Sequence, residues 1–290
     1  MEKNKQKIIK KKDVVINPLN KNELLAFLDD KSKEIIKYFI IKSLFSQPEP
    51  RINQKQLPVQ VPKEHIEQWF TQALNVKPVG AGSYPIDIYN DRDHWGADIK
   101  MLNIKIDKNG NVTNGDSGEA SLGQNFSDAG IKLDSLFLSK NHNKIKNNWI
   151  KLYKSKYDSL KKTYPIKSIF YFFILRPGVQ IKGADFYFCG ALLNVDNLDN
   201  VIVNKKRTTK SSVFLNNFIT DSLGNTKIYK AKKRLELRLK PKNWIENDMA
   251  IKISTSYMPS YVDLRSKDVG PKYLEKEIKK IQKIKIDFIA

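Results

Sequence analysis

SYPIDIYNDRDHWGADIKM, residues 83–101, has the alternation of apolar and polar side chains that is typical of two short β-strands joined by a polar turn. If the turn is centred just after Arg92, residues that face each other across the hairpin have numbers that sum to 185. Asp87 then lies opposite Asp98. Lys100 shares their face of the sheet, because side chains alternate with a period of two.

Two acids and a lysine on one sheet face suggest a particular chemistry. Directly opposed carboxylates have Cβ atoms about 5 Å apart and repel each other, which destabilises a bare sheet. A divalent cation removes this repulsion, and Mg²⁺ is commonly held by one or two carboxylates together with substrate phosphate. A neighbouring ammonium can stabilise negative charge that develops on phosphorus. The hairpin therefore predicts a metal site for phosphodiester hydrolysis, with a solvated hairpin carrying ordinary surface charges as the alternative.

The spacing Pro85-x-Asp87, ten residues, Asp98-x-Lys100 resembles the active-site signature of the PD-(D/E)xK nuclease superfamily, which includes the type II restriction endonucleases. The resemblance implies that Asp87, Asp98 and the backbone carbonyl of Ile99 bind Mg²⁺, with Mn²⁺ able to substitute. It also implies that Lys100 assists the attacking water.

The resemblance extends to further candidates outside the hairpin. Members of the superfamily often carry an extra acid on a helix before the catalytic hairpin, and the pattern from Pro62 to Asn75 predicts such a helix. Glu67 and Glu64 are the candidate acids, with a solvated helix face as the alternative. Many members also carry a supporting polar residue beyond the lysine, and Gln124 is the candidate here.

The charge of the chain is the second indication of function. Its 290 residues include 52 Lys and Arg against 31 Asp and Glu, a formal net charge of +21. An excess of this size is typical of proteins that bind polyanions. We expect double-stranded DNA as the partner, with an anionic membrane surface as the less favoured alternative, and no organic cofactor. No run reaches the roughly 18 apolar residues of a membrane span, so a cytoplasmic protein is predicted.

The last third of the chain is strongly basic. One cluster lies among Ser and Thr in a predicted loop, a composition that suits phosphate contacts; it comprises Lys205, Lys206, Arg207 and Lys210. A second set alternates with leucines in a predicted strand and gives it a cationic outer face; it comprises Arg234, Arg238 and Lys240. Such a strand could lie along a DNA groove, and a solvated outer face is the alternative.

These patterns predict an α/β fold, a mixed central β-sheet flanked by helices with a restriction-endonuclease-like core and a basic, β-containing C-terminal part. Three regions are expected. Residues 1–61 form a basic arm, a helical region and a Pro-rich linker, residues 62–195 the catalytic core, and residues 196–290 a basic DNA-binding extension that ends in a helix. The apolar stripe of that last helix, Pro271 to Ile284, either packs on the core or joins subunits.

The sequence thus predicts a Mg²⁺-dependent, sequence-specific double-stranded DNA endonuclease, a type II restriction enzyme that leaves 5′-phosphates. The resemblance implies a bacterial or phage-borne protein and a homodimer whose two sites cut both strands. Two alternatives remain open: a DNA repair or junction-resolving nuclease of the same superfamily, and a non-catalytic DNA- or RNA-binding protein.

Overall fold

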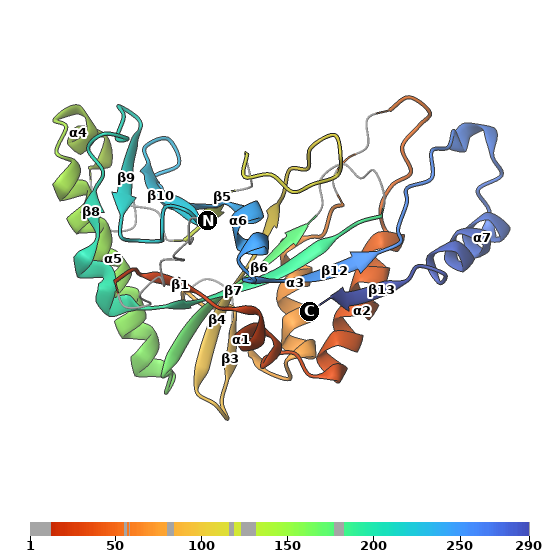
Figure 1. Ribbon diagram of the computed structural model, residues 1–290, viewed down its shortest axis with the longest axis horizontal. Coiled ribbons are helices and arrows are strands. Elements are labelled where there is room, and N and C mark those ends of the chain that lie inside the picture. Colours follow the sequence, from red (N-terminus) through yellow and green to blue (C-terminus); the bar gives the residue numbers. More distant parts are fainter. Residues whose placement is uncertain are drawn as a thin grey trace, which may run out of the picture.

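The computed structural model describes residues 13–54, 57, 59–79, 84–115, 119–122, 132–176 and 183–289. Their fold is mixed α/β, built around an eight-stranded sheet in the order β13-β12-β7-β6-β4-β3-β2, with β1 paired to β7 (Figure 1). The strands are β1 (Ile16–Pro18), β2 (Lys77–Pro78), β3 (Ile88–Asn90), β4 (Trp95–Asn103), β6 (Ser168–Arg176), β7 (Phe186–Leu193), β12 (Ala250–Thr255) and β13 (Ile286–Ile289).

Helices cover this sheet on both faces. On one face α2 and α3 bury side chains such as Ile36 and Phe70, and on the other α5 buries Trp149 and Tyr157. The helices are α1 (Lys21–Leu25), α2 (Asp30–Phe45), α3 (Lys63–Ala73), α4 (Leu133–Leu138), α5 (His142–Thr163), α6 (Pro241–Glu246) and α7 (Pro271–Ile281), with 3-10 turns η2 (Val195–Asn200) and η3 (Leu264–Ser266).

The predicted hairpin forms with the predicted register. Ile88 pairs with Ala97 and Asn90 with Trp95, so the paired numbers sum to 185. Its second strand, β4, continues as the centre of the large sheet and pairs in parallel with β6, while every other pair of neighbouring strands in the sheet is antiparallel. The chain reaches β6 through α5, so the expected order of hairpin, helix and two buried strands in a mixed sheet is confirmed.

A second, five-stranded sheet has the order β5-β11-β10-β9-β8. Its strands are β5 (Glu119–Ser121), β8 (Ile202–Val203), β9 (Ser212–Asn216), β10 (Gly224–Tyr229) and β11 (Arg234–Leu239). The leucines of β11 are completely buried against the core of the large sheet, as their alternation predicts. The prediction of a cationic outer face for β11 is wrong at the centre of the strand. Glu236 lies there, is only 1% exposed, and forms ion pairs with Lys227, Lys232 and Arg234.

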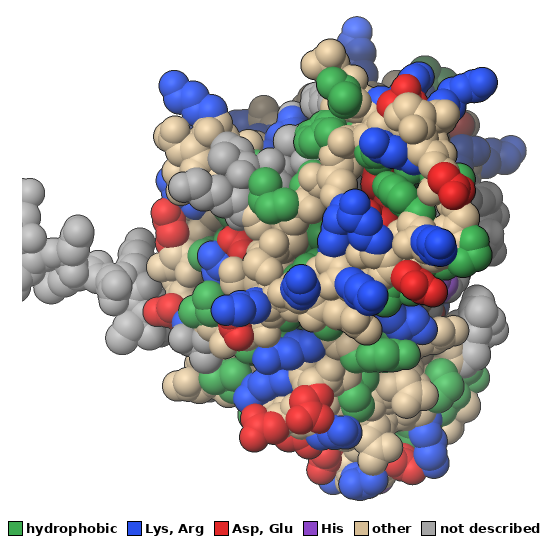
Figure 2. Space-filling view, turned by 90° about the vertical axis from the view of Figure 1, so that its right-hand side faces the viewer, with side chains coloured by type: hydrophobic (Ala, Val, Ile, Leu, Met, Phe, Trp, Pro, Cys, Tyr) green, Lys and Arg blue, Asp and Glu red, His purple; other side chains and the backbone are tan. Residues whose placement is uncertain are grey.

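The three predicted regions share one sheet, since β1 comes from the first region and β12 and β13 from the last. The predicted C-terminal helix forms as α7, which contacts α2 but leaves Leu274 51% and Ile278 37% exposed. Figure 2 looks onto this side of the molecule, where basic side chains are spread across the surface among hydrophobic ones. None of the described helices has the length and apolarity of a membrane span.

Candidate active site

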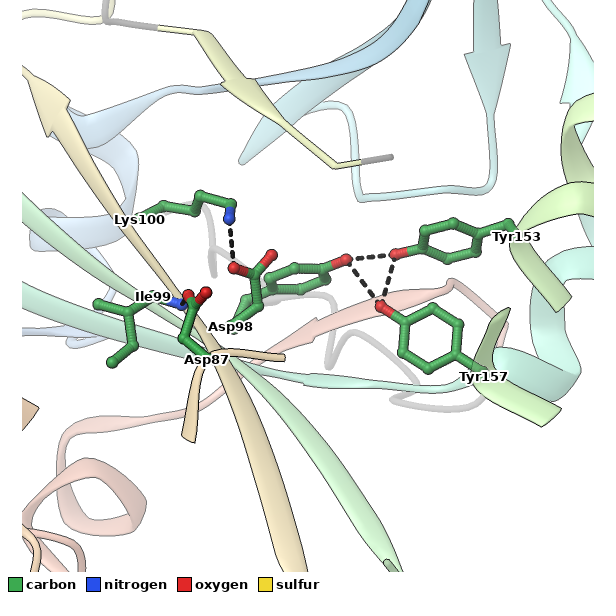
Figure 3. A network of polar contacts seen from close by, with 7 residues as sticks. Asp87, Asp98, Ile99, Lys100, Tyr153 and Tyr157 are labelled. Carbon is green, nitrogen blue, oxygen red and sulfur yellow. Dashed lines mark hydrogen bonds and ion pairs between the residues drawn. The ribbon is translucent and has the colours of Figure 1, made fainter. Parts of the chain in front are cut away.

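Asp98 and Lys100 lie at the middle of β4, on the face of the large sheet that α5 covers. Asp98 is only 8% exposed, on a strand that lies between β3 and β6 in the sheet. The Lys100 ammonium forms a short ion pair with Asp98 Oδ1. Figure 3 shows both side chains gathered with the carboxylate of Asp87. The structure therefore brings together the three side chains predicted from the hairpin.

Asp87 takes up a position just before β3 begins. Its backbone N–H still donates to the carbonyl of Ala97 at 2.8 Å, which continues the ladder by one residue. Its side-chain Oδ2 accepts a hydrogen bond of 2.7 Å from the backbone N–H of Ile99. The N–H and C=O of one strand residue point to the same side. The Ile99 carbonyl, the predicted third metal ligand, therefore faces the Asp87 side of β4.

Burial and like charge make the acid pair electrostatically unfavourable on its own. Burial raises the pKa of Asp98 to about 7, Lys100 opposes this rise, and the adjacent Asp87 carboxylate adds to it. Burial acts to lower the pKa of Lys100, but the charges of Asp98, Asp87 and Glu67 outweigh it and raise that pKa overall. Glu67, on α3, thus lies within electrostatic range of Lys100.

The donor set fits Mg²⁺. One oxygen of each carboxylate is already bonded, to the Ile99 N–H and to Lys100, and the other oxygen of each could ligate a cation. A divalent cation would also remove the repulsion that helps to hold the pKa of Asp98 up. Among the described residues no group of three His, Cys, Asp or Glu side chains gathers at one point. Two carboxylates with substrate phosphate and water are nevertheless a common Mg²⁺ site.

A pocket of about 380 Å³ opens beside Lys100 at the carboxyl ends of β4 and β6. The second sheet supplies the opposite wall through β5 and β11. Three cationic side chains line the pocket, namely Lys100, Arg176 and Arg234. We call it the β4–β11 pocket. Arg234, predicted as a DNA contact, lines this pocket together with the candidate catalytic lysine.

Sequence reasoning missed a cluster of three tyrosines behind Asp98. Tyr153 and Tyr157 on α5 and Tyr171 on β6 are at most 2% exposed, and their hydroxyls bond to one another (Figure 3). Tyr171 is the register partner of Asp98. Burial raises the pKa of all three phenols, so they stay neutral beside the acid. The spacing of Tyr153 and Tyr157, one helical turn apart, was the available signal.

The remaining predicted residues lie elsewhere. Gln124 falls outside the described residues, and so does the side chain of Glu64. Lys240 donates to the backbone carbonyl of Asp221 at 2.6 Å, and Arg238 is half-buried on β11. The basic loop joins β8 to β9, at the far edge of the second sheet from β5, and all four of its cationic residues are exposed: Lys205, Lys206, Arg207 and Lys210.

Comparison of the chain with protein-family models, with curated proteins and with solved structures finds no match.

Proposed function

We propose that this protein is a Mg²⁺-dependent, sequence-specific double-stranded DNA endonuclease of the type II restriction class, with the restriction-endonuclease-like core that the hairpin signature implies. The observation that carries the proposal is the convergence of Asp87, Asp98 and Lys100 on one sheet face, next to a pocket lined by two further cations. The chain's formal charge of +21 supports a polyanionic substrate.

Each residue of the proposed site has a separate role. Asp87 and Asp98 would hold the cation, with the Ile99 carbonyl as a third ligand, while the Ile99 N–H donates to the Asp87 carboxylate and fixes its position. When bound, Mg²⁺ supplies Lewis-acid stabilisation of the phosphate and lowers the pKa of a coordinated water. Lys100, held in place by Asp98, presents a positive charge where the transition state develops negative charge.

Incubation of the purified protein with plasmid DNA, in Mg²⁺ and in EDTA, tests the proposal. Discrete bands in Mg²⁺ alone are the expected result. A smear or a nicked product would point to the repair or junction-resolving nuclease, and intact DNA with a gel shift would leave a non-catalytic DNA-binding protein. Size-exclusion chromatography with light scattering tests the homodimer that the family resemblance implies.

Substitutions of the acids Asp87, Asp91 and Asp93 are expected to reduce cleavage activity to different degrees. Asp87→Asn should be inactive, because it removes a charged ligand, whereas Asp91→Asn and Asp93→Asn should keep most activity. Both lie in the exposed turn, where Asp91 pairs with Lys77 at 2.5 Å and Asp93 bonds Asn90. Initial rates of plasmid cleavage measure the ranking. The reverse order would move the metal site into the turn.

Metal affinity should depend on pH. A cation must displace the proton that Asp98 holds below its raised pKa of about 7. Mg²⁺ binding should therefore tighten by about tenfold per pH unit up to about 7 and level off above it. Isothermal titration calorimetry measures this, with Asp91→Asn expected to follow the wild type. A pH-independent affinity between 5.5 and 7 would remove Asp98 from the ligands.

A further inference from the structure

Among the three cationic side chains that line the β4–β11 pocket, Arg176 differs from the other two in its bonding partner. Lys100 is paired with Asp98, and Arg234 donates from Nε to Glu236 at 3.1 Å. Arg176, the last residue of β6, instead donates from Nε to the neutral amide oxygen of Asn103, its register partner on β4. Among the described residues no carboxylate forms an ion pair with it. Its charge is therefore not balanced by the part of the protein that the structure describes.

The absence of a carboxylate partner for Arg176 among the described residues is informative because the side chain is partly buried. Arg176 is half-buried, and burial lowers the pKa of its guanidinium. A charge withdrawn from water without a counter-ion is costly, and such charges normally pair or bind an ion. The bond to Asn103 uses only Nε, and no described residue bonds either terminal amino group of the guanidinium, which leaves both for a ligand at the pocket wall.

The geometry of the guanidinium selects the ligand. Its planar fork of N–H donors matches the oxygens of phosphate in a bidentate arrangement. We propose that Arg176 binds a backbone phosphate of the nucleic acid adjacent to the phosphate at Asp87, Asp98 and Lys100, with Arg234 on the opposite wall of the same pocket. This deepens the proposed function and rests on it. The alternative is that Arg176 is a structural tie, which only holds the ends of β4 and β6 together through its hydrogen bond to Asn103.

Fluorescence anisotropy with a labelled double-stranded oligonucleotide, in EDTA and at several salt concentrations, tests the proposal. Arg176→Ala should weaken binding by about ten- to a hundredfold, the effect of losing a hydrogen bond to a charged group. It should also reduce the slope of log affinity against log salt by about 0.9, the value for one phosphate contact. Arg176→Lys should retain the slope but only part of the affinity. Arg265→Ala, an exposed site on η3, is the charge-matched control and should change neither.

Plasmid cleavage in Mg²⁺ and a melting curve for each variant separate the outcomes. If the wild type cuts DNA while Arg176→Ala keeps its affinity and salt slope, the phosphate contact is overturned and the proposed function stands. The same holds if Arg176→Ala only melts earlier, which would indicate the structural tie. If the wild type binds but does not cut, and Arg176→Ala lowers the slope, the contact is supported and the nuclease is overturned.

Discussion

Asp98→Ala and Lys100→Ala are each expected to lower the rate of DNA cleavage by about a thousandfold or more. A bound metal ion supplies several kcal/mol of transition-state charge stabilisation, and every 1.36 kcal/mol changes a rate tenfold. DNA binding should remain largely intact, because these groups act on the scissile phosphate rather than on most of the interface. Asp98→Ala should in addition weaken Mg²⁺ and Mn²⁺ binding.

Both side chains are largely buried, so each variant needs a folding control. Removing either partner leaves the other charge buried and unpaired, a cost of several kcal/mol in folded proteins. Asp98→Asn keeps the shape of the side chain and should stay folded by circular dichroism while remaining inactive. A folded Asp98→Asn or Lys100→Ala protein that cuts at nearly the wild-type rate would show that the hairpin is not the catalytic site.

Joint replacement of the four cationic residues in the β8–β9 loop by Ala is expected to weaken binding to all DNA sequences. They are Lys205, Lys206, Arg207 and Lys210. Each phosphate contact adds about 0.9 to the slope of log affinity against log salt, so losing two to four contacts should lower it by about two to four units. Titrations at several salt concentrations measure this slope.

An equal change of charge elsewhere is the control for this variant. Four exposed lysines lie on α7 and just beyond it, at the opposite end of the molecule from β8 and β9 (Figure 1): Lys272, Lys276, Lys279 and Lys283. Their replacement should leave the slope near that of the wild type. Equal slopes for the wild type and the β8–β9 loop variant would remove that loop from the DNA interface.

The site could be predicted from local patterns where the physics is local. A two-residue period and one turn position are enough to pair Asp87 with Asp98, and the structure shows that register. Pro62 likewise marks the start of α3 as its N-cap residue, where its missing N–H costs no helical hydrogen bond. These features depend on residues within about 15 positions of each other, so one sequence is enough to place them.

Features that depend on distant pairing could not be predicted. Arg176 reads as the end of an apolar strand, and only the parallel register of β6 with β4 places it beside Lys100. The same register brings Tyr171 next to Asp98. Alternation puts Glu236 on the outer face of β11, where the structure finds it buried and ion-paired with Lys227, Lys232 and Arg234. A two-residue period predicts on which face of the sheet a side chain lies, but not which residues pack over that face.

Sequencing the ends of plasmid DNA cut by the wild-type protein in Mg²⁺ tests the central claim most directly. The proposed site predicts that every end lies at one short sequence, carries a 5′-phosphate that allows direct religation, and is missing from DNA treated with an Asp98→Asn preparation purified in parallel. Ends scattered over the plasmid, ends without a 5′-phosphate, or the same ends in the Asp98→Asn sample would contradict it.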